Sequence, residues 1–301
     1  MGHPGAGVAW VRGDAVAPSE ASAQGPSDAT NPLSQLRPLG PGAVLDGAVE
    51  LLRHRFGRIM ALAAGLYVPI WLLNVAVTVI DPTSLDSAEN GSGIVWSPIG
   101  ASTSDSAWMW MIGLLQVLAL STLGLMIGRL AAGLAEGRDP SLGDLARYGA
   151  RRCWVAALVV PMNMVVHTVG ACLGGVGWVL GDALVFVVSV AAGAEASGPV
   201  SAFRRSIQLT SSQYGRSLVL CTGALALSWV IRLSFSAGPT MLIASLDPSS
   251  RLVGLVGALS SAVTLLTEPL TACIAARAYL DLRCRRDGYD LELRRARLGL
   301  A

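Results

Sequence analysis

The sequence predicts an all-α, polytopic membrane protein with about six transmembrane helices, arranged as three hairpins that each follow an interfacial amphipathic helix. Of its 301 residues, 52% are hydrophobic and only 14% are charged, whereas soluble domains carry about 25% charged residues. The mean hydropathy is +0.55. Because so few polar groups are available to face water, lipid must cover much of the surface. Several apolar stretches also reach the roughly 20 residues that a helix needs to cross about 30 Å of hydrocarbon.

The first 40 residues differ from the rest of the chain. They are rich in Ala, Gly, Pro and Ser, and their longest apolar run is residues 8–11. Such a segment buries too little surface to offset chain entropy, so we expect a disordered tail over 1–40. It also lacks the basic start and apolar stretch of a secretory signal, so the first span is expected to act as the insertion signal. The predicted transmembrane domain covers 41–280, and an arginine-rich tail covers 281–301.

The apolar stretches divide into six predicted spans. They fall at 59–80, at 107–128, twice within 153–193, once within 217–246 and once at 252–276. The stretch 153–193 has Asp182 as its only charge and is twice as long as one helix requires, so a turn at 170–175 is predicted. The fifth span is expected to end near Gly238-Pro239.

The distribution of arginine orients these spans. All 22 basic residues are arginine, and those near span ends gather on one side, in the groups 53–58, 129–152, 204–216 and 277–297. The loop 81–106, on the other side, has four acidic residues and no basic one. Since arginine is retained in the cytoplasm, both termini are expected to be cytoplasmic and the protein to lie in the cell membrane, the bacterial inner membrane.

An internal repeat joins two of the predicted surface helices. At an offset of 158 residues, without a gap, Gly40-Pro41 matches Gly198-Pro199, Leu51 matches Leu209, and Gly57-Arg58 matches Gly215-Arg216. In each copy proline stands at a helix start, and the apolar residues that follow have a helical period, which suits a helix on the membrane surface. A third stretch, 139–152, also leads into a hairpin but does not align without gaps. The alternative is that any cytoplasmic helix entering a membrane has this pattern.

The C-terminal stretch 278–293, with the sequence AYLDLRCRRDGYDLEL, resembles the end of a large group of uncharacterised actinobacterial multi-pass membrane proteins. That group is related to the membrane domain of some glycerophosphoryl diester phosphodiesterases. Residues 195–209 and 37–52 resemble two further parts of it, so the likeness reaches from about 37 to 293. The resemblance implies a membrane domain without assigned catalytic residues, because the phosphodiesterase activity of its namesakes belongs to a separate barrel domain.

Four ionisable residues inside the predicted spans are candidate polar sites, because charges are costly in a bilayer. Asp182 and Arg232 both fall roughly 10 Å below the outer surface, so we expect them to pair. A structural clamp is the favoured role, and a substrate or proton site, or an Arg232 that snorkels alone, are the alternatives. Glu268 precedes Pro269, which favours a helix kink with a snorkelling acid over a transporter site. His167 is expected to be a hydrogen-bonded packing residue.

Glycines recur at 170, 174, 177 and 181, which fits either a turn or close helix packing. No nucleotide-binding or familiar hydrolytic motif occurs, and no CxxC pair or metal-ligand spacing. We therefore expect no enzyme activity, no catalytic, cofactor or metal site, and no nucleic-acid partner. The favoured function is a scaffold or accessory component of envelope or lipid-related machinery, with a transporter or flippase as the alternative. The expected partners are the lipid bilayer, whose anionic headgroups attract arginine, and a protein docked on the interfacial helices.

Overall fold

The computed structural model describes residues 39–80, 107–172, 174–246 and 250–298. These residues form helices and contain no strand. Six of the helical segments are long and apolar enough to span a membrane: Phe56–Val79, Met111–Ala135, Leu142–Cys172, Val176–Ala194, Tyr214–Ile243 and Leu255–Asp287. The predicted all-α polytopic class is thereby confirmed. The predicted N-terminal tail and the loop 81–106 lie outside the described residues, apart from Leu39 and Gly40.

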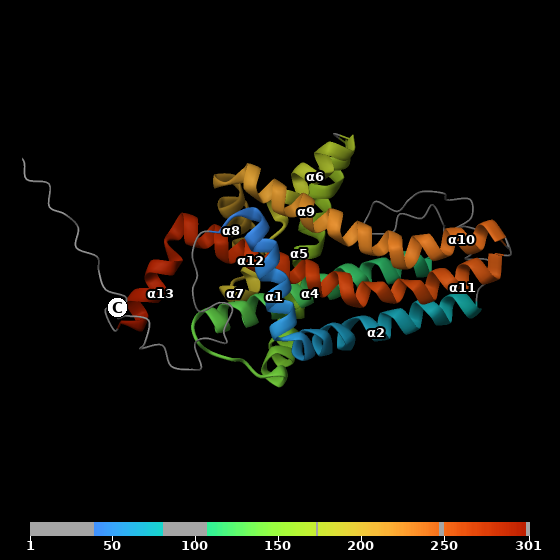
Figure 1. The fold of residues 1–301 in the computed structure, drawn as a ribbon, viewed down its shortest axis with the longest axis horizontal. Coiled ribbons are helices and arrows are strands. Elements are labelled where there is room, and N and C mark those ends of the chain that lie inside the picture. Colours follow the sequence, from blue (N-terminus) through green and yellow to red (C-terminus); the bar gives the residue numbers. More distant parts are fainter. Residues whose placement is uncertain (1–38, 81–106, 173, 247–249, 299–301) are drawn as a thin grey trace, which may run out of the picture. The chain divides into compact units, whose positions relative to one another are not determined.

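The described helices form three consecutive units, each with an outgoing and a returning span (Figure 1). Unit 1 contains α1 (Pro41–His54), α2 (Phe56–Ile80) and α4 (Ala107–Ala135). Unit 2 contains α5 (Leu142–Cys172), α6 (Gly174–Val185) and α7 (Val188–Ala194). Unit 3 contains α8 (Pro199–Ser212), α9 (Tyr214–Arg232), η2 (Leu233–Ala237), α10 (Gly238–Leu246), α11 (Ser250–Ser260), η3 (Ser261–Val263) and α12 (Thr264–Asp287). The short helix α13 (Tyr289–Arg297) follows.

The sequence repeat has the same helix bounds in both copies. Helices α1 and α8 are both 14 residues long and start 158 positions apart, after Gly40 and Gly198, whose backbones are both extended. The span helices α2 and α9 begin at the same offset, at Phe56 and Tyr214. Within these spans Leu62, Gly65 and Trp71 match Leu220, Gly223 and Trp229 at that offset. The repeat therefore extends from the surface helix into the outgoing span.

Unit 2 differs from the prediction of a separate surface helix, because α5 runs without a break from Leu142 to Cys172. In units 1 and 3 the backbone leaves helical geometry at Arg55 and Gln213, which separates the surface helix from the span. The start of α5 is capped instead by Ser141, whose hydroxyl accepts a hydrogen bond from the backbone N–H of Asp144 at 3.2 Å. The surface segment of unit 2 is thus the first few turns of the span helix itself.

The three units pack in a cyclic order. Each returning span packs against the outgoing span of the next unit: α4 against α5, α6 against α9, and α12 against α2. Each surface segment packs against the returning span of the preceding unit: the first turns of α5 contact α4 at Gly149 and Met126, α8 contacts α6 and α7, and α1 contacts α12. The helices α4, α7 and α12 contact one another between the units. The last unit therefore closes onto the first.

Glycine allows the closest helix crossing in this arrangement, between α4 and α7. A Cβ atom added at Gly128 would collide with the backbone of Val190, and one added at Gly193 would collide with the backbone of Leu125. Both glycines are thus required for the approach of the two backbones, as in close-packed transmembrane helices.

The glycines between 170 and 181 serve both of the roles that the sequence left open. Gly174 has φ +83° and reverses the chain between α5 and α6. Gly170 packs against the backbone of Gly177, and Gly181 packs against Val166, so the two helices also approach closely.

The predicted end of the fifth span and the predicted start of the C-terminal tail both fall within continuous helical segments. The fifth span does not end at Gly238-Pro239, because the π-helical segment η2 leads directly into α10, where Pro239 occupies a first-turn position that needs no N–H donor. Figure 1 shows α10, α11 and α2 side by side, in agreement with their contacts. Helix α12 continues through 281, the predicted start of the C-terminal tail, to Asp287, with Asp281, Leu282 and Cys284 buried. A left-handed Gly288, with φ +66°, then ends α12.

Candidate functional sites

Asp182 lies in α6 and joins this helix to α5 and α9. Its carboxylate is 2.9 Å from His167 Nε2 on α5, across the hairpin turn, and accepts a contact of 3.3 Å from the thiol of Cys221 on α9. The His167 ring also lies 5.7 Å from the ring of Trp178. The prediction that His167 is a hydrogen-bonded packing residue agrees with these contacts.

The predicted pair between Asp182 and Arg232 is wrong, because Arg232 pairs with Glu268 on α12. Helix α9 passes Asp182 at Cys221, and Arg232 lies 11 residues further along, about 16 Å at the rise of an α-helix. The sequence estimate placed both residues at the same depth because it ended the fifth span too early. The side chain of Glu268 is only 12% exposed, and it is held by Arg232, whose side chain is 45% exposed, rather than snorkelling alone.

A set of three arginines connects the units at the end of the bundle where most arginines lie, which we call the arginine-rich end. Each donates to the backbone carbonyl that precedes the N-cap residue of the next unit. Arg58 of unit 1 bonds to Pro140 O at 3.2 Å, Arg152 of unit 2 to Ser197 O at 3.0 Å, and Arg216 of unit 3 to Leu39 O. These three bonds repeat the cyclic order of the helix packing, so we call them the arginine ring.

Carboxylates accompany two of the three junctions. Asp139 pairs with Arg58 and, at 3.2 Å, with Arg55. Asp281 accepts from Arg216 at 2.7 Å, from Arg285 at 3.2 Å and from the backbone N–H of Leu39 at 2.9 Å. Asp281 is 4% exposed, so its charge requires such partners, and the guanidinium of Arg277 also interacts with it electrostatically.

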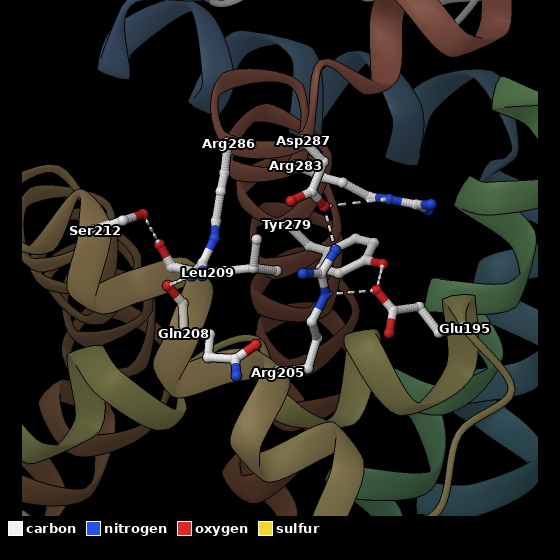
Figure 2. Close-up of polar contacts among 9 residues, drawn as sticks. All are labelled: Glu195, Arg205, Gln208, Leu209, Ser212, Tyr279, Arg283, Arg286 and Asp287. Carbon is white, nitrogen blue, oxygen red and sulfur yellow. Dashed lines mark hydrogen bonds and ion pairs between the residues drawn. The ribbon is translucent and has the colours of Figure 1, made fainter.

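A second polar cluster joins α12 to α8 and to the end of α7 (Figure 2). Arg205 donates to Glu195 at 2.8 Å and also bonds to Asp287, while the hydroxyl of Tyr279 donates to Glu195 at 2.9 Å. Figure 2 also shows Arg286 reaching the backbone carbonyl of Gln208 on α8. Burial alone would lower the pKa of Arg205, but the hydrogen bonds to the two carboxylates outweigh it and raise the pKa above the ordinary value.

These contacts explain the C-terminal signature in structural terms. Tyr279 fastens α12 to unit 2 through Glu195, and Asp281 fastens it to unit 1 through the backbone N–H of Leu39. Asp287 fastens α12 to α8 of its own unit, and Gly288 supplies the left-handed turn after it. Tyr289 is buried with its ring 3.8 Å from the guanidinium of Arg283. The part of the sequence with the most specific pattern therefore fastens α12 to its neighbours in the bundle.

The outward faces of the surface helices combine apolar and basic side chains. On α8, Val200 and Ile207 are 70% and 36% exposed, and Arg204 lies on the same face, four residues after Val200. On α1, Val49 is 49% exposed and Arg53 follows it by four residues. We call these the outer stripes of α8 and α1. The opposite faces of both helices, including Val44, Ala48, Ala202 and Leu209, are fully buried against the bundle.

Among the described residues, no group of His, Cys, Asp and Glu side chains is arranged to hold a metal ion. Sequence reasoning found Asp182, Arg232, Glu268 and His167 but not their pairing, and it missed the arginine ring. The repeat at offset 158 carried a signal for the ring, because it aligned Arg58 with Arg216.

Comparisons with protein-family models, with curated proteins and with solved structures found no match for this chain.

Proposed function

We propose that this chain is a non-enzymatic component of the bacterial inner membrane, a scaffold or accessory subunit that supports envelope or lipid-related machinery. The observation that carries the proposal is the pair of outer stripes on α1 and α8. Each surface helix already buries one face in the bundle, yet it keeps apolar side chains beside arginine on the other. Such a face suits the headgroup region of a membrane with anionic lipids, or a protein that docks there.

The outer stripes are tested by purification from native membranes in mild detergent, with wild type compared with the double variant Val200→Ser, Arg204→Ser. Both side chains are exposed, so the variant is expected to keep the yield and melting temperature of wild type. We expect the same protein or anionic lipid to accompany wild type in replicate preparations and to be depleted from the variant. Repeated recovery of wild type without any accompanying protein or lipid would count against the proposal. So would recovery of the same amount of that protein or lipid with wild type and with the variant.

We place the arginine-rich end in the cytoplasm, together with both termini, on the basis of the arginine asymmetry. In a background without the five native cysteines, a cysteine at Ser92 should react with an impermeant thiol reagent in intact cells. One at Ser141, beside the start of α5, should react only after the cells are opened. The reverse pattern would overturn the orientation, and labelling at both positions would overturn the number of spans between them.

A transporter or flippase for a small or amphiphilic molecule is the second candidate. It is favoured by irregular backbone inside the spans, the π-helical η2 and the 3₁₀ segment η3, together with the charged pair Arg232–Glu268. Protein in liposomes should then move an amphiphilic probe such as a fluorescent phospholipid, and Asp182→Asn or Glu268→Gln should stop the movement without lowering the folded yield. Equal movement in empty liposomes would reject this candidate.

We also infer that the chain belongs with the actinobacterial multi-pass proteins related to the glycerophosphoryl diester phosphodiesterase membrane domain. The support is the resemblance over residues 37–293 and the dense contacts of its most specific part, 278–293. An alignment of sequences from that group should then keep Tyr279 together with an acid at 195, and Asp281 together with an arginine at 216. Independent variation at these paired positions would remove the support.

A further inference from the structure

A small, partly open cavity lies in the membrane-spanning part of the bundle, between α2, α4, η3 and the start of α12. Its polar lining consists of Tyr67, Trp71, Gln116, Ser261 and Thr264. Tyr67 is nine residues after Arg58 on α2, about 14 Å from the arginine-rich end. The cavity therefore lies at a depth where the surrounding lipid offers no hydrogen bonds.

One lining group is buried without a partner. Tyr67 is 3% exposed, and its hydroxyl forms no hydrogen bond with any described residue. A buried hydroxyl left in this state destabilises the fold, and most such groups in native proteins bond to protein or to ordered water. The amide of Gln116 likewise forms no hydrogen bond within the described part of the chain.

The other polar groups of the cavity are committed to the protein, and of these Ser261 and Thr264 retain acceptor capacity. Ser261 donates to Ala258 O at 2.6 Å and accepts from Asn74 at 3.3 Å. Thr264 donates to Ser261 O at 2.5 Å. Trp71 donates to Ala258 O at 3.1 Å and so leaves no proton for the cavity. Tyr67 and Gln116 are the two groups with unused donors.

The cavity has room for about one water molecule, and a buried water needs two to four polar partners. We propose that it is a water-binding site, in which one ordered water accepts a hydrogen bond from the Tyr67 hydroxyl and donates one to the amide oxygen of Gln116. The hydroxyl oxygen of Thr264 is the remaining acceptor. The site stands apart from the arginine ring and the outer stripes, and it holds whether the protein is a scaffold or a transporter.

The sign of a stability change separates a hydrated cavity from a dry one. In a dry cavity, Tyr67→Phe removes an unsatisfied hydroxyl and should leave the melting temperature in detergent unchanged or raise it. With a bound water, the same substitution removes one of its partners, and we expect a fall of about 2 to 4 °C. Tyr148→Phe is the matched reference, because the Tyr148 hydroxyl donates directly to Gly193 O at 3.0 Å. A Tyr67→Phe protein as stable as wild type would overturn the proposal.

The bridge itself is tested by combining Tyr67→Phe with Gln116→Leu. These two side chains share the proposed water. The melting temperature of the double variant should therefore be little lower than that of the more destabilised single variant. Strictly additive changes would contradict a shared water.

Radiolytic footprinting gives a readout independent of stability, because a bound water generates hydroxyl radicals beside its partners. Tyr67 should then be oxidised several-fold faster than Tyr279, which is equally buried but bonded to Glu195. Gln116→Leu should abolish the difference. Equal slow oxidation of both tyrosines in wild type would show that the cavity is dry.

Discussion

The guanidinium of Arg216 donates a hydrogen bond to the backbone carbonyl of Leu39, 177 residues earlier in the chain. Leu39 immediately precedes the N-cap of the first surface helix, so this contact joins the third unit to the first. The same arginine pairs with Asp281, whose side chain is only 2% exposed. One side chain thus satisfies a backbone acceptor in unit 1 and a buried carboxylate in α12.

Loss of Arg216 should destabilise the protein. Arg216→Ala leaves Asp281 with two partners, Arg285 and the N–H of Leu39, so we expect a loss of about 2 to 3 kcal/mol, below the 3 to 5 typical of an isolated buried pair. Thermal unfolding in detergent measures it. Arg204→Ala is the control, because Arg204 is exposed on the neighbouring helix α8 and its loss should change stability little. Equal effects of the two variants would contradict a role for the ring.

The crossing of α4 and α7 predicts a strong difference between glycines. Gly128→Ala or Gly193→Ala forces a methyl group into the backbone of the facing helix, which should cost about 1 to 3 kcal/mol or more. Gly65→Ala, in α2, places its methyl group where no atom lies within 4 Å and should be tolerated. The folded yield and melting temperature of the three variants test this. A Gly65→Ala protein as unstable as the other two would point to a general requirement for glycine instead.

The charged residues inside the spans should couple in the pairs that the structure gives. In a double-mutant cycle, Arg232→Leu and Glu268→Leu should interact by about 0.5 to 3 kcal/mol, because each single variant leaves its partner unpaired. Asp182→Leu and Arg232→Leu should be additive to within about 0.5 kcal/mol. The free energy of unfolding in detergent is the measurement. Strong coupling between Asp182 and Arg232 would restore the pair that the sequence suggested.

The fold should lose stability in alkali through Tyr289. Burial raises the pKa of Tyr289 above its usual value of about 10, and the guanidinium of Arg283 over its ring only partly offsets this. A raised pKa means that the folded state favours the neutral phenol. The stability that burial of the neutral Tyr289 phenol contributes is therefore complete below pH 10. It is lost as the pH rises through the pKa that Tyr289 has in the folded state.

Tyr289→Phe tests this contribution, because the Tyr289 hydroxyl has no hydrogen-bond partner among the described residues. The variant should match wild type in melting temperature at pH 7 and exceed it at a pH above 10. If the melting temperatures of the two proteins change in parallel over the whole pH range, the titration of Tyr289 is not linked to unfolding.

The fold followed from the sequence more completely than the sites did. The lengths of apolar stretches fix the number of helices, and the gapless match of Gly40-Pro41 with Gly198-Pro199 located both surface helices. The partners of Asp182 and Arg232 could not be found in this way, because hydropathy marks where a span exists but not how far it is shifted against its neighbours. Helix α9 continues through η2 past Pro239, which moves Arg232 away from Asp182 and towards Glu268.

The cyclic order of packing has a consequence for the order in which the protein is made. Helix α1 is synthesised before the six spans, yet Val44, Ala48 and Leu51 on its inner face are buried in the finished bundle, where α1 packs against α12 in the last of these spans. Before α12 is inserted, the membrane surface is the apolar environment available to this face. Helix α1 must therefore lie on the bilayer while five spans are inserted. A chain that stops before α12 therefore presents a free amphipathic helix at the membrane, which distinguishes an unfinished molecule from a completed one.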